Sequence, residues 1–441
     1  MRNNKFYFCC KSCSTGITAS EWIAQNQQCS RCGGKLVYTE YKFEKEQLTY
    51  LLRKDHNPKN MWHYFDILPL NDKNNIVTFN EGIVDINRWL FMEKFAKDVH
   101  DIDCKIYAQR NDQNQSTGTF KDLAGTVVAS FLRENRQYAY VVASTGNIAN
   151  SFAKYLAKAD ISLYAFVPKN SSPYQISGIR AYGQKVYRVE GDYTRAKQVA
   201  SDFASSRNFL LAAGNFDPLR IEAKKIMVYE WLRQLDEYPT VYIQALSGGT
   251  GPLGIQKAHS ELKQIGMDIP YPRQLLIQSD KCAPMALAWN KAKSNGFPEG
   301  WENDYPILTD PETDIPTLST GDPKTYPVLG PFVHKTKGEI IAAKESLAAD
   351  IARMIAFETS TLIGPAAALP IAGIFQSFKK GLIKNGDVLL INIGEGIRRS
   401  PRFLRKIADS EDTIQDAAEC KNFDREHYRT NLWETIQKHY S

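Results

Sequence analysis

Short runs of β-branched and aromatic residues alternate with longer segments whose apolar positions recur every three to four residues. The short runs predict buried strands, and the longer segments predict amphipathic helices that cover them. Repeated alternation of the two is typical of parallel sheets with helices on both faces, so the sequence predicts an α/β fold. The predicted strands are residues 104–109, 138–144, 162–168, 185–191, 240–247, 273–279 and 387–396.

Three segments depart from this alternation. The polar stretch 40–60 predicts a helical arm followed by a turn, and the aromatic cluster 61–70 is expected to pack that arm onto the body. Residues 296–335, which are rich in Pro, Asp and Thr, are expected to form a long irregular excursion on the surface.

Length and charge narrow the class of protein. A chain of 441 residues with 43% hydrophobic and 24% charged residues is expected to be globular, with two or three domains. The 55 basic and 49 acidic residues are scattered, and only 397–406 is locally basic, so we expect a solvated helix start there and no nucleic-acid partner. No run has the length of a signal peptide or a membrane span, so a cytoplasmic location with no membrane partner is expected.

The N-terminus carries the clearest metal-binding pattern. Cys10-x2-Cys13 is followed, after fifteen residues, by Cys29-x2-Cys32, and paired thiolates at this spacing can reach one tetrahedral ion. A zinc ribbon with structural zinc is therefore predicted, with an unmetallated hairpin as the alternative and Cys9 as a possible substitute for Cys10. Buried thiols are expected for the remaining cysteines, Cys104, Cys282 and Cys420.

The first of three notable strand-to-helix turns contains a lysine. Ser116-Thr117-Gly118-Thr119 precedes Phe120-Lys121-Asp122, and a helix is expected to begin at or next to Lys121. The helix dipole disfavours a cation at this end, and the same field with partial burial would lower the amine pKa toward a neutral nucleophile able to form a Schiff base. The alternative is a lysine that reaches solvent.

The second turn, Ser144-Thr145-Gly146-Asn147, joins a predicted strand to a helix. Hydroxyls, backbone N–H groups and a helix N-terminus at the carboxyl end of a strand form an anion site suited to a carboxylate. Taken alone, Asn147 is more simply explained as an N-cap.

The third turn runs from Ser247 to Gly254, and its glycines let the backbone wrap around a phosphate group. Gly249, Gly251 and Gly254 also match G-x-G-x-x-G, and Asp280 follows the next predicted strand, which leaves a nucleotide (NAD(P))-binding oxidoreductase as an alternative. Two features argue against that alternative. Asp280 lies further after the glycines than the acid of a dinucleotide site usually does, and Pro252 removes one backbone N–H donor from the loop.

A phosphate loop, a carboxylate turn and a candidate Schiff-base lysine together suit pyridoxal phosphate (PLP) acting on an amino acid. The chain resembles the fold-type-II PLP enzymes, which are tryptophan synthase β-like, and within them the threonine synthase and cysteate synthase branch. The motifs "STGTFKD", "ASTGN" and "SGGTG" occur in that family's order, and the resemblance covers roughly residues 60–400. A third class, a zinc-ribbon nucleic-acid binder with a degenerate enzyme body, would rest on the ribbon and the net charge of +6 alone.

The resemblance implies two parallel-sheet domains and an N-terminal zinc-ribbon-like segment. The implied divisions are 1–40 for the ribbon, 41–118 for the arm and the first part of the large domain, 119–213 for the small domain and 214–441 for the rest of the large domain. It also implies a homodimer that acts on a small amino-acid substrate. The reaction would be elimination or replacement on an O-phospho amino acid, by a lyase or a transferase.

The resemblance also implies site roles. Lys121 would form the internal aldimine and shuttle the α-proton, Phe120 would shape the cofactor wall, and Asn147 would bind the phenolic oxygen of the cofactor. The substrate carboxylate would be held by Ser144, Thr145 and Gly146, and the cofactor phosphate by Gly248, Gly249, Thr250 and Gly251.

Two departures from the family pattern affect the reaction. The stretch "INIGEG" (391–396) has no Ser or Thr to face the pyridine nitrogen, which would instead meet Asn392, Ile393 or Gly394, with Glu395 able to come near. The acidic-proline motif is replaced by residues 364–366, Gly-Pro-Ala. For a phosphate leaving group, at least one small-domain cation is expected to face the site; the candidates are Lys169, Arg180, Lys185 and Arg188.

Overall fold

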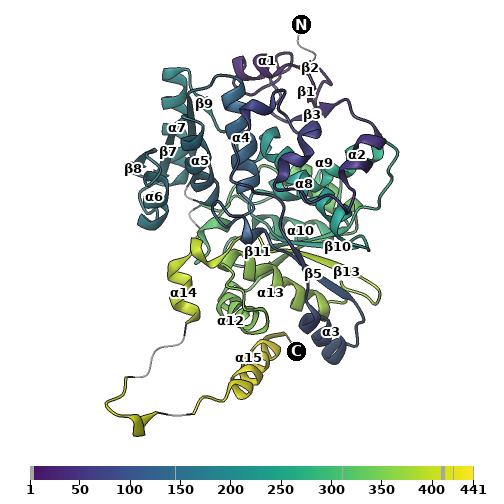
Figure 1. Ribbon diagram of the computed structural model, residues 1–441, viewed down its shortest axis with the longest axis vertical. Helices are drawn as coiled ribbons and strands as arrows, with labels where there is room; N and C mark the ends of the chain where they lie inside the picture. The colour runs from purple at the N-terminus through teal and green to yellow at the C-terminus, as the bar shows by residue number, and fades with distance from the viewer. Residues whose placement is uncertain (1–3, 145, 310, 409–412, 421, 441) are drawn as a thin grey trace.

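The computed structural model describes residues 4–440 apart from 145, 310, 409–412 and 421, and it contains three sheets (Figure 1). The large sheet has the strand order β12-β11-β10-β13-β5-β4, and its strands are parallel except for β4, which pairs antiparallel with β5. The predicted α/β class is confirmed. The strand bounds are β4 Ile86–Arg88, β5 Lys105–Gln109, β10 Val241–Ala245, β11 Arg273–Ser279, β12 Glu339–Ala343 and β13 Val388–Asn392.

Helices bury both faces of the large sheet. Alternate residues of β10 enter different cores, because successive side chains of a strand point to opposite faces. Tyr242 packs in the core that contains residues of α8 (Pro218–Gln234) and α9 (Thr250–Gln264), whereas Val241 and Ile243 pack in the core that contains α13 (Pro365–Lys379). All five residues of β13 are buried, as its apolar sequence predicts.

The second sheet is parallel, with the order β8-β7-β6-β9, and all its strands fall within residues 139–211. Ala196, Ala200 and Ala204 of α7 pack on one face, and this close packing requires small side chains. The sheet lies within 119–213, but the exact domain boundaries remain our proposal. Its elements are β6 Ala139–Ala143, β7 Ser162–Pro168, β8 Lys185–Val189, β9 Leu210–Leu211, α5 Asn147–Lys158, α6 Pro173–Arg180 and α7 Tyr193–Arg207.

The N-terminal segment forms a small antiparallel sheet, β2-β1-β3, at the top of Figure 1. Phe8 of β1 and Trp22 of α1 pack with Phe131 of α4 (Asp122–Glu134), so aromatic contacts fix this segment to the body. The predicted arm is confirmed as a short helix, α2, followed by a buried 3-10 segment at Met61–Ile67. The other bounds are β1 Phe6–Cys10, β2 Gly16–Ile17, β3 Val37–Tyr41, α1 Ala19–Ala24 and α2 Lys45–Leu51.

The prediction of irregular structure throughout 296–335 is wrong in part. Its last ten residues form α11 (Tyr326–Lys335), which buries Tyr326, Leu329 and Val333 against the body. Pro327 is tolerated because it lies in the first turn, where its missing N–H has no intrahelical partner. The prolines led to a prediction of irregular structure, although the apolar residues of this segment recur at helical spacing.

The remaining helices lie on and below the lower face of the large sheet in Figure 1, apart from α10, which packs against β12 at its edge. The last helix, α15, buries Leu432, Ile436 and Tyr440 at four-residue spacing and stacks Trp433 on Phe95. The bounds are α3 Leu90–His100, α10 Pro284–Ser294, α12 Ala348–Thr359, α14 Pro401–Ile407 and α15 Arg425–Tyr440. Within the residues that the structure describes, no helix has both the length and the apolar composition needed to cross a membrane.

Candidate active site

The loops that carry the sequence motifs follow the carboxyl ends of parallel strands, the edge at which open α/β sheets bind ligands. Backbone bonds tie the lysine turn to the loop after β13: Phe120 N donates to Gly394 O at 3.1 Å, and Gly396 N donates to Gly118 O at 2.9 Å. The turn after β6 joins them through Asn147, whose Nδ2 donates to Glu395 Oε2 at 2.5 Å. Three segments far apart in sequence therefore form one site.

Lys121 is the N-cap residue of α4, as predicted, and its side chain is partly buried. Nζ lies 4.1 Å from the centroid of the Phe120 ring, so Phe120 forms a wall beside the amine. Burial first, and then the charge of Arg220, lowers the pKa of the Lys121 ammonium to about 7, while Glu395 acts in the opposite direction. A large fraction of the amine is therefore neutral and nucleophilic near neutral pH.

Glu395 is buried next to the lysine, and burial raises the pKa of its carboxyl group. Asn147 holds this carboxyl through Nδ2, and its own Oδ1 accepts a hydrogen bond from Arg399 Nε at 3.3 Å. A second guanidinium nitrogen of Arg399 donates to Gln175 Oε1 at 3.0 Å, so Arg399 connects the large sheet's loop to α6. Asn147 is the first residue of α5 and not its N-cap, because Gly146 occupies that position.

The turn after β6 carries the residues expected to bind a carboxylate. Ser144 is partly buried and its Oγ accepts from Gly146 N at 3.3 Å. Gly146 caps α5 in extended conformation, with the helix N-terminus directly behind it. Thr145 lies outside the described residues.

The loop after β10 is built from backbone. Gly249 has φ +77°, which favours glycine, and α9 begins at Thr250. A Cβ at Gly248 would lie 2.0 Å from Asn215 Nδ2, and one at Gly251 would lie 2.4 Å from Gln244 Oε1, so neither position has room for a side chain. Within the described chain, the N–H groups of residues 248–251 donate to no protein acceptor, which leaves them free for an anion at the helix N-terminus.

Comparisons with known proteins show the family to which the chain belongs. The description "Pyridoxal-phosphate dependent enzyme" matches residues 92–394. The chain belongs to this family. A threonine synthase from Methanocaldococcus jannaschii is 23% identical over 397 residues, which cover 86% of this chain and 94% of that protein. A cysteate synthase from Methanococcoides burtonii is 30% identical over 346 residues, which cover 76% of this chain and 79% of that protein.

Solved structures of PLP enzymes share the fold. A fungal L-serine ammonia-lyase from Rhizomucor miehei superposes with a TM-score of 0.59 at 14% identity, covering 74% of this chain and 96% of that one. Cysteine synthase from Entamoeba histolytica gives 0.58 at 14% identity, covering 80% and 93%. The predicted fold-type-II architecture is confirmed, and the family makes a PLP phosphate a better ligand for the glycine loop than a dinucleotide.

An orphaned polar group also fits this PLP enzyme's cofactor. Gly82 N donates to Asn114 Oδ1 at 2.8 Å, Asn114 Nδ2 donates to Asn111 Oδ1 at 3.3 Å, and Asn111 Nδ2 donates to Asn392 Oδ1 at 2.9 Å. Since the first donor is a backbone N–H, the relay fixes every amide in turn and leaves Asn392 Nδ2 buried with no hydrogen-bond partner among the residues that the structure describes. Among the three positions that the resemblance leaves open for the ring nitrogen, Asn392 has the polar side chain.

Three of the four small-domain cations have partners outside the candidate site, and the expectation that at least one of the four faces the site stays a prediction. Among the four small-domain cations, Lys169 pairs with Glu190, Lys185 lies over Tyr187, and Arg188 donates to the carbonyl oxygens of residues 169 and 171. Arg399 contacts the site residue Asn147, although it belongs to the segment 397–406, for which a solvated helix start was expected. The available signal was a basic segment directly after the loop that follows β13.

The four N-terminal cysteines converge as predicted. The Cys10 and Cys32 sulfurs are 3.6 Å apart, as are those of Cys13 and Cys29, and all four lie within 4.8 Å of one another. Four thiolates about 2.3 Å from one zinc ion would be about 3.8 Å apart, so the cluster fits a tetrahedral site. Cys9 Sγ lies 3.9 Å from the carbonyl oxygen of Cys10 and is outside the cluster.

We expect a Gly249→Val substitution to weaken PLP binding about tenfold or more. A β-branched residue at φ +77° is strained by roughly 1–2 kcal/mol, and relieving the strain would redirect the loop N–H groups. Titration of the cofactor-free chain with PLP measures the effect. Gly266→Val is the matched control, because Gly266 follows the other end of α9 with φ +76° and open space around it. Equal affinity losses in the two variants would place the phosphate elsewhere.

Proposed function

We propose that this PLP enzyme removes phosphate from an O-phospho amino acid, by elimination or by replacement with a nucleophile. The observation that carries the proposal is the meeting of a partly buried, low-pKa Lys121, a backbone-lined anion loop and an arginine, Arg399, that contacts Asn147 at one edge of the sheets. The similarity to a threonine synthase and a cysteate synthase supports the same class of reaction.

The residues present would hold the cofactor from several sides. Lys121 Nζ would bind the aldehyde carbon, residues 248–251 would bind the phosphate, Asn147 would bind the phenolic oxygen, and Asn392 Nδ2 would donate to the ring nitrogen. When bound, PLP supplies an electron sink for a negative charge at the substrate α-carbon. A neutral amide donor opposite the ring would leave the nitrogen unprotonated, which limits that sink and favours departure of a β- or γ-substituent.

Lys121 also has a role in proton transfer. A pKa of about 7 lets Nζ accept the substrate α-proton and return a proton later without a large energy penalty in either direction. Ser144, Thr145, Gly146 and the N-terminus of α5 would bind the substrate carboxylate. Fixing both the carboxylate and the amine side of the substrate would hold the α-hydrogen toward Nζ.

Arg399 would bind the leaving phosphate or an incoming anion. Among the described residues its hydrogen bonds go to neutral amide oxygens, on Asn147 and Gln175, and its charge also acts on the nearby Glu395 carboxyl. An anion would give it a direct charged partner. A desolvated phosphate dianion needs such charge-assisted hydrogen bonds. Two branches of chemistry fit this arrangement: O-phosphohomoserine with water, or O-phosphoserine with sulfite.

A homodimer, expected from the resemblance, is part of the proposal.

We expect phosphate release from O-phosphoserine or O-phosphohomoserine, and dependence on sulfite would select the first substrate's branch. Loss of an arginine–phosphate contact should lower kcat/KM for the phosphorylated substrate about 10- to 100-fold in Arg399→Gln. The assay follows inorganic phosphate with each substrate, with and without sulfite. Turnover of serine or O-acetylserine, with no release from either phospho amino acid, would show that the phosphate leaving group is wrong.

A further inference from the structure

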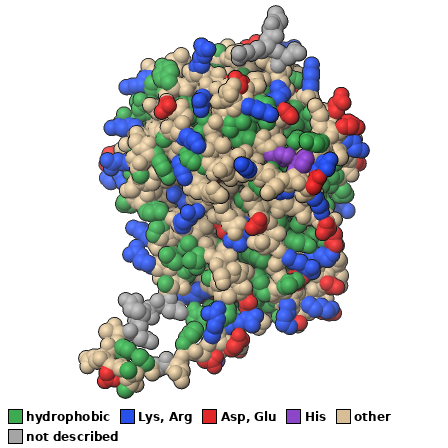
Figure 2. All heavy atoms as spheres, in the orientation of Figure 1, with side chains coloured by type: hydrophobic (Ala, Val, Ile, Leu, Met, Phe, Trp, Pro, Cys, Tyr) green, Lys and Arg blue, Asp and Glu red, His purple; other side chains and the backbone are tan. Residues whose placement is uncertain are grey.

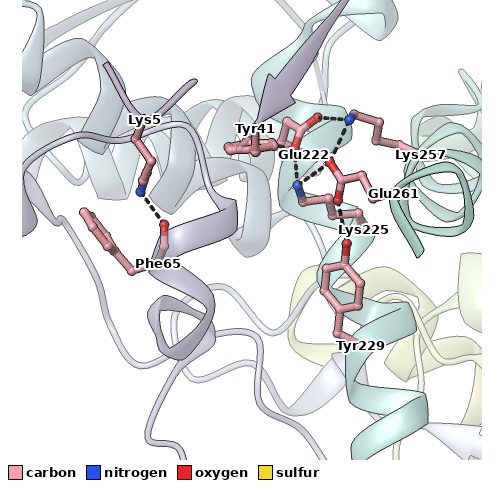
Figure 3. Close-up of polar contacts among 8 residues, drawn as sticks. All are labelled: Lys5, Tyr41, Phe65, Glu222, Lys225, Tyr229, Lys257 and Glu261. Atoms are coloured by element: carbon pink, nitrogen blue, oxygen red, sulfur yellow. Dashed lines mark hydrogen bonds and ion pairs between the residues drawn. The ribbon is translucent and has the colours of Figure 1, made fainter. Parts of the chain in front are cut away.

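Two adjacent lysines of α8 are both fully buried but have opposite surroundings. Lys225 Nζ is paired with Glu222 Oε2 at 2.5 Å and with Glu261 Oε1 at 2.9 Å. Figure 3 shows the closed cluster that these groups form with Lys257, Tyr41 and Tyr229. Two lysines balance two glutamates there, as buried charges in a folded chain require.

Lys224, in contrast, has no carboxylate partner among the described residues. Its Nζ donates to Arg220 O at 3.2 Å, and within the described residues no carboxylate lies within ion-pair distance of it. Its exposed fraction is 0%. An ammonium buried with one neutral acceptor is strongly unfavourable unless an anion joins it, so the surroundings of Lys224 point to a ligand that is not a protein group.

The packing of Lys224 places it beside the phosphate loop. A Cβ built at Gly254, in the second turn of α9, would lie 2.8 Å from Lys224 Cβ. Lys224 Nζ also lies 5.5 Å from the centroid of the Phe120 ring, next to Lys121. The Lys224 side chain is therefore at the junction of α8, α9 and the start of α4, with its amine on the side of Phe120.

Arg220, one turn earlier on α8, reaches the same loop. Its guanidinium lies 3.5 Å from Asn215 Oδ1, which also accepts from Thr250 Oγ1 at 3.3 Å. Arg220 is buried, and its Nε has no partner among the described groups. A second orphaned donor thus adjoins the first residue of α9.

The charges around Lys224 leave a positive excess. The groups that act on it are the cations Lys121 and Arg220 and a single carboxylate, Asp217. Burial first, and then these two cations, lowers the pKa of Lys224 well below its ordinary value, so an anion bound beside the amine would favour its protonated form. The N-termini of α4 and α9 add further positive potential.

We propose that Lys224, assisted by Arg220, provides the positive charge that binds the cofactor phosphate as a dianion at the first turn of α9. The inference rests on the assignment of PLP and is independent of the leaving group, so its test measures binding and not turnover. A phosphate monoester has a second pKa near 6 and is mostly dianionic at neutral pH. Glycine N–H groups give it hydrogen bonds without neutralising its charge, and Lys224 would take up a proton to do so.

The test compares Lys224→Met with the unmodified full-length chain after removal of the cofactor. The variant should bind PLP about 10- to 100-fold more weakly, and it should bind pyridoxal, which lacks the phosphate, within about twofold of the unmodified chain. Calorimetry in buffers of different ionisation enthalpy should show an extra proton taken up with PLP relative to pyridoxal. That extra proton should be missing in Lys224→Met.

Stability separates a binding role from a structural one. Cofactor-free Lys224→Met should melt at or above the temperature of the unmodified chain, because it removes an unpaired buried amine. Lys225→Met should melt well below it, because Glu222 and Glu261 lose a partner. Lys263→Met, on the exposed face of α9, is the neutral control. Unchanged PLP affinity in Lys224→Met, equal losses for PLP and pyridoxal, or melting as low as that of Lys225→Met would each overturn the proposal.

Discussion

Replacing Lys121 with alanine should abolish covalent attachment of PLP and lower turnover about 1,000-fold or more. In the proposed mechanism the variant loses both the amine that binds the aldehyde and the group that moves the α-proton, and a positioned proton-transfer group alone contributes about 10²- to 10⁴-fold. PLP should still bind through its phosphate, because the loop at 248–251 and its N–H groups are not altered. Turnover and cofactor content measured on the same preparation separate these effects.

The same prediction has a pH dependence and a chemical signature. Since the Lys121 pKa is lowered to about 7, the neutral amine is the main form above that pH, and covalent uptake of PLP by the cofactor-free chain should become faster as pH rises through about 7. Borohydride reduction followed by peptide mapping should place the cofactor on the peptide that contains Lys121. Label on another lysine, or reduction that traps no cofactor, would refute the assignment.

The local parts of the fold and site could be predicted because their signals lie within a few residues. Gly249 requires a positive φ, and Lys121 precedes a helix whose apolar positions recur regularly. Each such turn follows a strand, and parallel strands bring their carboxyl ends to one edge. The sequence therefore indicated which turns would meet, although not which atoms would touch.

The residues that were missed depend on packing between distant segments. Lys224 and Lys225 are neighbours of the same type, and nothing local indicates that one meets two carboxylates while the other meets none. Arg399 lies in a basic stretch of the kind that usually covers a solvated helix, yet it contacts Asn147, 252 positions earlier. Charge and hydropathy along the chain cannot distinguish these cases, because burial and partners decide them.

Two departures from the family pattern prove to be one feature of the site. The acidic-proline motif is absent at 364–366, and an acid, Glu395, stands in the loop where a hydroxyl was expected. In the structure, Ala366 N donates to Glu395 Oε1 at 3.1 Å, and a Cβ at Gly364 would lie 2.7 Å from the same oxygen. Glycine at 364 therefore makes room for the carboxylate, and a larger residue there would displace Glu395 from Asn147.

Basic and acidic side chains are interspersed over the face shown in Figure 2, which agrees with the scattered charges of the sequence. The basic side chains of Arg220 and Lys224 are instead buried, and that of Lys121 beside them is partly buried. A buried excess suits a small anion better than an extended polyanion, because low dielectric strengthens a short-range pair and excludes a large partner. This argument favours the enzyme over the nucleic-acid binder among the functions that the ribbon alone would allow.

Replacing Cys29 and Cys32 together with serine should remove one zinc ion per chain and unfold the N-terminal ribbon. The sulfurs of the four cysteines already complete a tetrahedron, and zinc in such sites supplies much of the free energy that folds a small domain. Trp22, which is buried against Phe8 and Phe131, should become exposed, and its fluorescence should shift to longer wavelength. Elemental analysis of protein purified without chelators measures the metal directly.

The ribbon prediction has a matched control in Cys9→Ser. Cys9 neighbours a ligand in sequence, but its sulfur lies outside the cluster, so this variant should keep both the zinc and the Trp22 emission. Loss of the ribbon should also weaken the body, because Tyr41 at the end of β3 donates to Glu222 Oε2 in the cluster that pairs Lys225. The double variant should therefore melt at a lower temperature, whereas a metal-free wild-type chain with a native ribbon would show that these cysteines are packing residues.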